Sequence, residues 1–446
     1  MVSKYKLSMF TTYTVNERNE IILYNSLQGL ESVKCVNSGT DVEKWLNNEK
    51  CYEANDNKIF KWLVNNNYLV EDDTDEKAQR NAKIANLLED NTLHLTIHLT
   101  ECCNFRCEYC NVWENGGNIS NETEKSIVQF IRHNIYKYKG VYIDWFGGEP
   151  LLKIDTIVRM SKSIIDICKA AKKPYCAGIT TNGYLLTLEN VQKLIGCRVV
   201  DICVTIDGNK DIHNSMRKLV SGEGTYDVII NNLMGIKKKI QNRFLEVTIR
   251  VNLTKDIVDS FDIFYNELDE KFGNDIRFSV FIKKVNDWGA EGVDNIRDKL
   301  ICYTDIVDVF EKIKRNPKKL SIKENFSELE FGGRCCTASR RNNYTIYTNG
   351  MVGRCENPTN GMTIGHINDV STWLTDYVNY PKWCGQAYNM PNRCDDCLMS
   401  PLCFSQECPK LVIEKEKQDC ILTDTYIKRM LELFVVLNEE RSINIE

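Results

Sequence analysis

The chain has 446 residues, a formal net charge of −5, 43% hydrophobic residues and 27% charged residues. This composition is typical of a globular protein of about two to four domains. The small negative charge gives no reason to expect non-specific binding to nucleic acid. No apolar run is long enough to cross a bilayer, and the first residues lack the apolar core of a signal peptide. We therefore expect a cytoplasmic protein without nucleic-acid or membrane partners.

The first 90 residues are predicted to form a small separate domain. Short strands mixed with short helices suggest a winged-helix-like unit, and no Arg/Lys face marks it as a DNA reader. One prediction is that this unit binds a peptide, by pairing an extended segment with the edge of a sheet. The alternative is that the unit only packs against the rest of the protein. The pattern predicts strands over 6–15, 20–25 and 67–70, and helices over 41–46, 58–64 and 76–88.

A strand predicted over 93–99 leads into a loop that carries three spaced thiols. Cys103, Cys107 and Cys110 follow a C-x3-C-x2-C spacing. Three thiolates can ligate three irons of a 4Fe–4S cluster, which leaves the fourth iron open to another ligand. The alternative is a zinc site, but structural zinc sites use four protein ligands, often in C-x2-C pairs. The spacing therefore favours an iron–sulfur cluster.

Strands and helices are predicted to alternate from about residue 92 to 290. Such alternation indicates a parallel sheet with outer helices, and six strands fall short of a complete eight-stranded barrel. The helix after the cysteine loop is predicted to start at Asn121, with Glu124 completing a capping box. The strand candidates are 93–99, 141–146, 176–181, 199–206, 246–251 and 276–282.

Polar and glycine-rich turns follow three successive strands of this predicted sheet. They are Gly147-Gly148-Glu149-Pro150, Thr180-Thr181-Asn182-Gly183 and Thr205-Ile206-Asp207-Gly208. Ordinary turn chemistry explains each turn taken alone. Because active sites of parallel α/β folds collect at the carboxyl ends of strands, one shared ligand explains the series better.

A second group of cysteines lies beyond a charged, helical stretch at 300–330, which is predicted to be a bridge. Without a secretion signal, a disulfide framework is not expected, and metal clusters account better for so many thiols. A structural zinc domain is the alternative. A final amphipathic helix is predicted over 421–438. The thiols in question are Cys335, Cys336, Cys355, Cys394, Cys397, Cys403, Cys408 and Cys420.

Taken together, these motifs resemble radical S-adenosylmethionine (AdoMet) enzymes with a SPASM extension, and in particular maturases of ribosomally made peptides. The resemblance implies that the Gly147–Pro150 turn binds the amino group of AdoMet and that Arg217 contacts its carboxylate. His213 is expected to be structural rather than a base. No catalytic residue is assigned beyond the cluster ligands. The implied cofactor-binding residues are Gly147, Gly148, Glu149, Pro150, Thr181, Asn182, Thr205, Asp207 and Arg217.

The same resemblance implies two auxiliary 4Fe–4S clusters, which makes three clusters in all. Cys394, Cys397, Cys403 and Cys420 would bind the outer cluster. Cys355 and Cys408 would bind the inner cluster, together with Cys335 or Cys336. The fourth inner ligand stays open: both adjacent cysteines could bind, Cys384 could join, or one iron could be open to a substrate thiolate.

The implied fold is a partial (β/α)6 TIM-like barrel between a winged-helix-like N-terminal domain and a SPASM domain. The predicted boundaries are 1–90 for leader recognition, 91–299 for the barrel, 300–330 for the bridge, 331–425 for the SPASM domain and 426–446 for the last helix.

The implied activity is cleavage of AdoMet to a 5′-deoxyadenosyl radical, followed by an oxidative crosslink within a precursor peptide, of the thioether or carbon–carbon type. The expected partners are that peptide, with its leader sequence, and an electron donor such as flavodoxin or ferredoxin. One alternative is a sulfatase-type maturase that oxidises a single Cys or Ser to formylglycine. Another is a non-enzymatic zinc or iron–sulfur interaction module.

Overall fold

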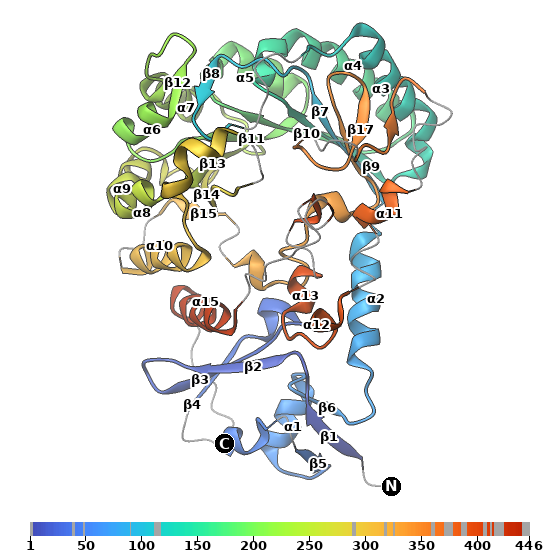
Figure 1. Cartoon of the computed structure of the whole chain (residues 1–446), viewed down its shortest axis with the longest axis vertical. Helices are drawn as coiled ribbons and strands as arrows, with labels where there is room; N and C mark the ends of the chain where they lie inside the picture. The colour runs from blue at the N-terminus through green and yellow to red at the C-terminus, as the bar shows by residue number, and fades with distance from the viewer. Residues whose placement is uncertain are drawn as a thin grey trace.

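Three regions make up the chain in the computed structural model, which Figure 1 shows. The barrel of strands and helices lies at the top of the view and the N-terminal unit at the bottom, with the cysteine-rich region (residues 331–425) between them. The structure describes residues 3–37, 41–47, 50–89, 91–110, 117–287, 291–315, 319–323, 326–357, 362–369, 378–384, 390–404, 408–410, 413 and 423–438.

The largest sheet contains the six parallel strands that the sequence predicts, in the order β14-β13-β11-β10-β9-β7. A central, mostly parallel α/β sheet is therefore confirmed. The strands are β7 (Thr92–His98), β9 (Gly140–Phe146), β10 (Tyr175–Thr181), β11 (Val199–Thr205), β13 (Glu246–Leu253) and β14 (Phe278–Lys284). The helices that connect or flank them are α3 (Asn121–Asn134), α4 (Ile154–Ala170), α5 (Leu188–Gly196), α6 (Lys210–Met216), α7 (Tyr226–Lys239), α8 (Lys255–Asp259) and α9 (Phe261–Phe272).

Apolar and polar side chains alternate along the strands, so that one face of the sheet contributes to the apolar core and the other is polar. In β9, Ile143 and Trp145 are fully buried in the hydrophobic core, whereas the alternate residues Tyr142 and Asp144 are only partly buried. Side chains on a strand point alternately to its two faces. The sheet thus packs one apolar face under the helices and turns a polar face inward.

Short strands extend this sheet at both edges. β16 (Asn343–Ile346) runs parallel to β7, and the antiparallel strands β17 (Met351–Gly353) and β18 (Gly365–His366) follow it. At the other edge, β15 (Ser321–Ile322) pairs with β14. Part of the cysteine-rich region is therefore built onto the barrel sheet itself.

Helix α3 begins at Asn121, as predicted, but it lacks the predicted capping box. Ser120 is the N-cap, and its side-chain oxygen accepts a hydrogen bond from the backbone N–H of Thr123. Glu124 instead pairs with Arg159 of α4, with a nitrogen–oxygen distance of 2.8 Å. The predicted capping box is therefore wrong, because an ion pair between helices takes up the carboxylate.

The N-terminal unit holds two three-stranded antiparallel sheets, β5-β1-β6 and β2-β3-β4. The single strand predicted over 6–15 is wrong. The chain turns at Ser8, whose carbonyl accepts from the N–H of Thr11, and passes from one sheet to the other. The elements are β1 (Lys4–Leu7), β2 (Thr11–Val15), β3 (Glu20–Asn25), β4 (Lys34–Asn37), β5 (Cys51–Glu53), β6 (Leu69–Glu71), α1 (Lys58–Asn65) and α2 (Glu76–Leu88).

The remaining helices lie between and beside these two bodies (Figure 1). The predicted final helix is present as α15. The other α-helices in the described part of the chain are α10 (Tyr303–Arg315), α11 (Asn379–Cys384), α12 (Asn392–Asp395), α13 (Ser400–Cys403) and α15 (Asp424–Leu437). The 3₁₀ helices are η1 (Gly29–Ser32), η2 (Asp41–Trp45), η3 (Ile135–Lys137), η4 (Pro150–Lys153), η5 (Glu291–Lys299), η6 (Ser327–Leu329) and η7 (Thr337–Ser339).

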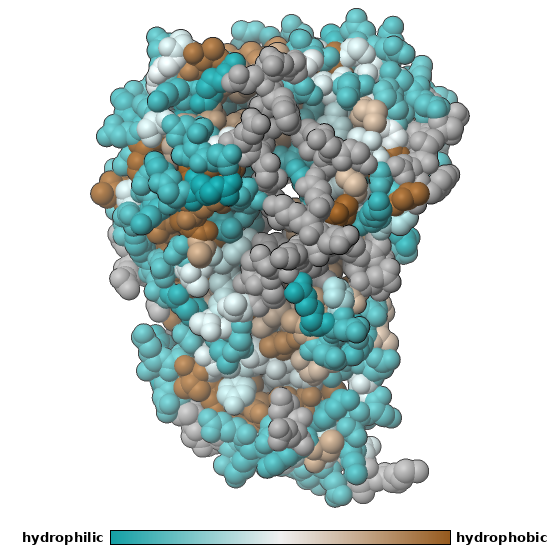
Figure 2. Space-filling model, in the orientation of Figure 1, coloured by the Kyte–Doolittle hydropathy of each residue, from teal (hydrophilic) through white to brown (hydrophobic). Residues whose placement is uncertain are grey.

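The surface seen in Figure 2 is largely hydrophilic, with apolar residues in small separate groups. Among the helices that the structure describes, none combines the length and the apolar character needed to cross a membrane.

Candidate active site

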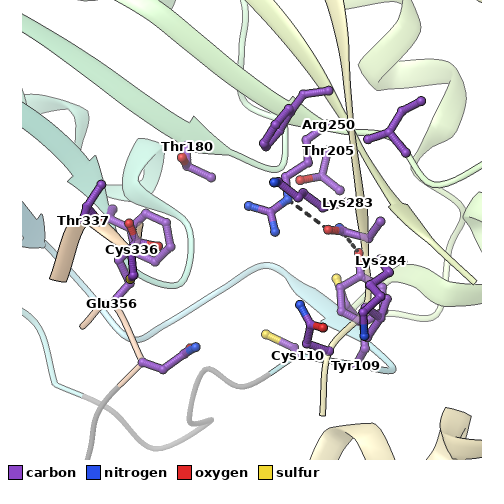
Figure 3. A pocket seen from close by; sticks show the side chains of 18 of the residues that line it. Tyr109, Cys110, Thr180, Thr205, Arg250, Lys283, Lys284, Cys336, Thr337 and Glu356 are labelled. Carbon is purple, nitrogen blue, oxygen red and sulfur yellow. Dashed lines mark hydrogen bonds between the residues drawn. The ribbon is translucent and has the colours of Figure 1, made fainter. Parts of the chain in front are cut away.

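A cavity of about 610 Å³ lies where the carboxyl ends of the barrel strands face the cysteine-rich region. The three thiols of the cysteine loop line it, as do strand-end residues of the barrel and residues of the cysteine-rich region. In Figure 3, Tyr109 and Cys110 lie on one side of the cavity and Cys336 and Glu356 on another, with Arg250 above them. The cavity therefore joins the two groups of cysteines that the sequence singles out.

The cysteine loop is held by a two-stranded sheet that the sequence does not predict. β8 (Phe105–Cys107) pairs antiparallel with β12 (Arg217–Leu219), and this places Arg217 opposite Cys107. The Phe105 side chain is buried beneath the loop, and the backbone N–H of Phe105 donates to the sulfur of Cys103 at 3.4 Å. This pairing fixes the loop without using any of its thiols.

The three thiols fit an iron–sulfur cluster by their chemistry. Burial, together with the neighbouring loop thiols, raises the pKa of Cys103 to about 11 and that of Cys107 to about 12. Such thiols are neutral at physiological pH unless a cation binds them, and a bound metal deprotonates its thiol ligands outright. Cys110 is the exposed member of the set.

The Gly147-Gly148 turn packs against the backbone of this loop. Gly147 has a φ of +125°, and a Cβ atom there would overlap the carbonyl oxygen of Thr100. A Cβ atom at Gly148 would overlap the carbonyl oxygen of Cys102, and the N–H of Gly148 donates to Thr100 at 2.7 Å. Only glycine allows this close approach. The turn and the loop therefore form one rigid wall, and Pro150 opens η4 directly behind it.

Glu149 is fully buried and joins this wall to the next strand end. Its carboxylate accepts hydrogen bonds from the hydroxyl of Thr181 at 2.7 Å and from the N–H groups of Asn182 at 2.8 Å and Leu151 at 3.0 Å. The amide of Asn182 in turn donates to Asn104 at 2.8 Å. Three protein donors satisfy the carboxylate, so Glu149 orients the strand-end residues around the cavity.

Asp207 and Arg217 form the core of a second buried network. Asp207 accepts from the hydroxyl of Tyr109 and from the N–H of Asn252, the latter at 2.9 Å. The guanidinium of Arg217 lies 3.6 Å from Asp207 and donates to Tyr109 at 2.6 Å. Within the described residues, the buried Nε of Arg217 has no hydrogen-bond partner. Since Arg217 and Thr205 line the cavity, a ligand carboxylate there could complete this bonding.

His213 is part of the scaffold. It is fully buried, its Nδ1 accepts from the N–H of Asp207 at 3.2 Å, and its Nε2 lies 3.0 Å from the hydroxyl of Thr225. Both ring nitrogens are therefore engaged by protein groups, as expected of a structural histidine.

Sequence reasoning missed several residues that line the cavity. Tyr109 lies between two loop cysteines, and Arg250 and Asn252 are alternate polar residues of the apolar strand β13. That alternation is the signal that could have found them. Glu356 directly follows Cys355, and burial raises its pKa, an effect that Arg250 opposes. No spacing rule marks an acidic residue beside a cysteine.

A second cavity of about 230 Å³ has Cys336, Cys355 and Cys408 in its lining. Burial, together with the charge of Cys408, raises the pKa of Cys336 to about 11. Cys335 is absent from this lining and borders the apolar cluster of Ile84, Leu88 and Phe404 instead. The structure thus separates the adjacent thiols. Only Cys336 of the pair joins the lining of this second cavity.

The other cysteines predicted to bind a cluster differ in their surroundings. Cys394, Cys397 and Cys403 follow one another through α12 and α13, and the N–H of Met399 donates to the sulfur of Cys397 at 3.4 Å. Cys384 is absent from the lining of both cavities and interacts with Tyr380 and Arg354. Cys420 lies outside the described residues. Within the described part of the chain, no three Cys, His, Asp or Glu side chains are placed to hold a single metal ion.

Comparison with known proteins agrees with this arrangement. Residues 97–266 match the model of the Radical SAM superfamily. The mycofactocin maturase MftC of Mycolicibacterium smegmatis is 26% identical over 178 residues, which cover 39% of this chain and 41% of MftC. The chain thus spans less than half the length of that relative. The radical SAM cyclopropyl synthase TigE of Paramaledivibacter caminithermalis is 24% identical over 374 residues, 74% of this chain and 72% of TigE.

Two groups of solved structures share the fold. anSMEcpe with bound AdoMet has a TM-score of 0.60 and 19% identity, covering 78% of this chain and 100% of that one. Streptococcus suis SuiB bound to S-adenosylmethionine has a TM-score of 0.52 and 15% identity, covering 92% of this chain and 97% of SuiB. SuiB has also been solved with its precursor peptide SuiA.

Proposed function

We propose that this chain is a radical SAM maturase that installs an oxidative intramolecular crosslink in a ribosomally made precursor peptide, because residues 97–266 match the model of the Radical SAM superfamily. One observation carries the proposal: the cysteine loop, the polar strand ends and two thiols of the second group, Cys335 and Cys336, all line a single cavity. SuiB, which shares the fold, has been solved with its precursor peptide SuiA, and this supports a peptide substrate.

The loop thiols Cys103, Cys107 and Cys110 would hold a 4Fe–4S cluster with one open iron for AdoMet. When bound, the clusters of such an enzyme supply the electron that splits AdoMet into methionine and a 5′-deoxyadenosyl radical, and they accept the electron left after ring closure. The chain itself positions AdoMet, positions the peptide and excludes water.

We assign AdoMet to the wall formed by the cysteine loop and the strand-end turns. Backbone groups of Gly147 and Gly148 border the cavity, and the side chains of Thr181, Asn182 and Thr205 lie beside them. Arg217 offers its buried, unpartnered Nε to the AdoMet carboxylate. Glu149 and Asp207 act through their neighbours, because protein donors already occupy both carboxylates.

Glu356 is the residue that we assign to proton removal from the peptide. Closing a ring from a thiol or a carbon takes one hydrogen atom and one proton from the substrate, so a base must face the cavity. Glu356 lines the cavity beside Cys336, away from the AdoMet wall. Burial raises its pKa, and a carboxylate with a raised pKa is a stronger base.

The auxiliary clusters would lie in the cysteine-rich region. Cys336, Cys355 and Cys408 would hold the inner cluster, in which three thiols leave an iron that a substrate thiolate could bind. Cys394, Cys397 and Cys403, with Cys420, would hold the outer cluster. The smaller cavity, which Cys336, Cys355 and Cys408 line, supports the assignment of the inner cluster. The short spacing of Cys394, Cys397 and Cys403 along α12 and α13 supports the assignment of the outer cluster.

The N-terminal unit would bind the leader of the precursor peptide. β2 is an edge strand that pairs only with β3 among the described strands, and its Tyr13 and Val15 side chains are exposed on one face. An extended leader could add to this edge as a further strand. The likeness to SuiB extends over 92% of the chain, against 78% for anSMEcpe. The extra N-terminal unit of about 90 residues is the feature that favours a peptide maturase over a sulfatase-type maturase.

Activity of the reconstituted protein tests the proposal. With dithionite and AdoMet, the wild type should form 5′-deoxyadenosine, and a variant with alanine at all three loop cysteines should not. No 5′-deoxyadenosine from the wild type would favour a non-enzymatic metal module. Flavodoxin or ferredoxin should replace dithionite as the electron donor.

Co-expression with a peptide encoded beside the gene identifies the product. A crosslink removes two hydrogens, about 2 Da, and blocks fragmentation between the two joined residues in tandem mass spectrometry. An aldehyde that reacts with a hydrazide probe would instead support the sulfatase-type alternative.

A further inference from the structure

Helix α2 belongs to the N-terminal unit by sequence but packs along the cysteine-rich region in space. Figure 1 shows it running from the N-terminal sheets up beside α12 and α13. Ile84 and Leu88 of α2 are fully buried with Phe404, and Cys335 and Met390 border the same apolar cluster. A helix that buries its apolar face on another region is part of the core of that region.

The polar contacts of α2 converge on the segment between two cysteines. Arg80 is 1% exposed, and its NH1 donates to the carbonyl of Asp395 at 2.8 Å and to the hydroxyl of Ser400 at 3.0 Å. Its NH2 donates to the carboxylate of Asp395 at 2.9 Å. Lys77 holds the other oxygen of that carboxylate at 2.7 Å and reaches Asp396 at the same distance.

Asp395 and Asp396 are the two residues that separate Cys394 from Cys397. The backbone of this segment makes local turn bonds: Asp395 N–H donates to the carbonyl of Pro391 at 3.2 Å, Cys397 N–H to that of Cys394 at 3.2 Å, and Ser400 N–H to that of Cys397 at 3.0 Å. The bonds described for the carbonyl of Asp395 and for the carboxylates of Asp395 and Asp396 come from α2. Arg80 in turn needs this segment, because a buried guanidinium without hydrogen-bonding partners is strongly unfavourable. Charge-assisted hydrogen bonds therefore link α2 to this segment.

We propose that Arg80 is a positioning residue of the outer cluster site: it holds the Cys394–Cys397 segment in the conformation that binds iron. This inference rests on the proposed function, in which Cys394, Cys397 and Cys403 are cluster ligands. The outer cluster is then assembled on two parts of the chain more than 300 residues apart, since Arg80 and Asp395 are 315 positions apart.

One consequence concerns the boundary at residue 90. A chain that lacks residues 1–90 also lacks Arg80 and Lys77, so it should lose the outer cluster together with any leader-binding surface. Loss of activity on that deletion would therefore not report on leader recognition alone. Point variants in the full-length chain separate the two effects.

The test uses full-length protein, purified and reconstituted without oxygen. Arg80→Ala should lower bound iron by about four of about twelve atoms per chain, the content of one 4Fe–4S cluster among three. The EPR signal of one auxiliary cluster should disappear, while the signals of the other two clusters persist. Arg80→Lys should retain part of the iron, because a lysine cannot make all three bonds of the planar guanidinium. Circular dichroism checks that each variant folds.

Arg341→Ala is the matched control, because Arg341 pairs with Glu89 at the end of the same helix at 3.2 Å, away from the cysteine segment. It should leave iron content and EPR signals unchanged. If Arg80→Ala fails to fold, Asp395→Asn decides, since it keeps the size of the side chain and removes the charge that Arg80 and Lys77 hold. Full iron and unchanged EPR in that variant, or in Arg80→Ala, would overturn the inference. A wild-type protein that holds about four irons or zinc would instead overturn the cluster assignment itself.

Discussion

Arg217 lies directly opposite Cys107 across the small antiparallel sheet of β12 and β8. The pairing places a buried guanidinium beside a buried thiol, and the charge of Arg217 is the leading influence that lowers the pKa of Cys107 against the effect of burial. The same guanidinium reaches Tyr109 and approaches Asp207. Through Arg217, the pairing of β8 with β12 thus links the cysteine loop to the carboxyl ends of β11 and β13.

Arg217→Ala should weaken AdoMet binding by about 10- to 100-fold. A hydrogen bond from a charged group contributes about 1.5–3 kcal/mol, and tenfold in affinity corresponds to about 1.4 kcal/mol. Equilibrium binding of AdoMet to the reconstituted protein measures the effect. Lys218→Ala, at the exposed next position of β12, should bind AdoMet as the wild type does. Equal affinity in the two variants would contradict the assignment of Arg217.

Local pattern was enough to predict the barrel. All six parallel strands were predicted, because apolar and β-branched runs between helical patterns report burial of one sheet face. The strand-end motifs then meet at one cavity because parallel strands end at the same edge. The cysteine spacing gave the loop thiols without any structural information.

Contacts between segments that are far apart in the chain could not be predicted from local sequence pattern. Nothing in the sequence pairs residues 105–107 with 217–219, or adds β16 and β17 to the edge of the barrel. The cysteine pattern could not say whether Cys335 or Cys336 faces Cys355, because adjacent residues differ only in side-chain direction. Arg80 looked like one polar residue of a surface helix. Its burial follows from tertiary packing alone.

Stability should fall as the pH rises toward neutrality, because of Asp144. Burial, with the nearby carboxylates of Glu356 and Asp201, raises the pKa of Asp144 from 3.8 to about 7. Between those pH values the folded chain keeps a proton that the unfolded chain has lost, so raising the pH lowers the free energy of unfolding. The loss is about 4 kcal/mol and ends above pH 7, where both states are ionised.

Asp144→Asn should flatten this dependence, because asparagine does not titrate. Denaturant unfolding of the wild type and the variant between pH 5 and about 8 would measure the difference. Asp262→Asn, on the exposed face of α9, serves as the control and should keep the wild-type slope. A slope that Asp144→Asn leaves unchanged would mean that Asp144 is ionised in the folded chain.

Glu356→Gln should separate AdoMet cleavage from formation of the product. Glutamine keeps the shape of the side chain but cannot accept the substrate proton. The yield of crosslinked peptide per 5′-deoxyadenosine should therefore fall by about 100-fold, the usual scale of general base catalysis. Mass spectrometry of the peptide and chromatography of the nucleoside give the two quantities. Glu101→Gln changes a carboxyl in the same cavity that is bonded to Thr348, and it should leave the ratio unchanged.

Replacing the two adjacent cysteines one at a time should give different losses of iron. Cys336 lines the smaller cavity with Cys355 and Cys408, so Cys336→Ala should remove the inner cluster and about four irons per chain. Cys335 is absent from that lining and borders the apolar cluster of Ile84, Leu88 and Phe404, so Cys335→Ala should spare the inner cluster. Iron analysis with EPR of the reduced protein distinguishes the two. Loss of the inner-cluster signal in both variants would show that the adjacent thiols bind together, and that the inner cluster has no open iron for a substrate thiolate.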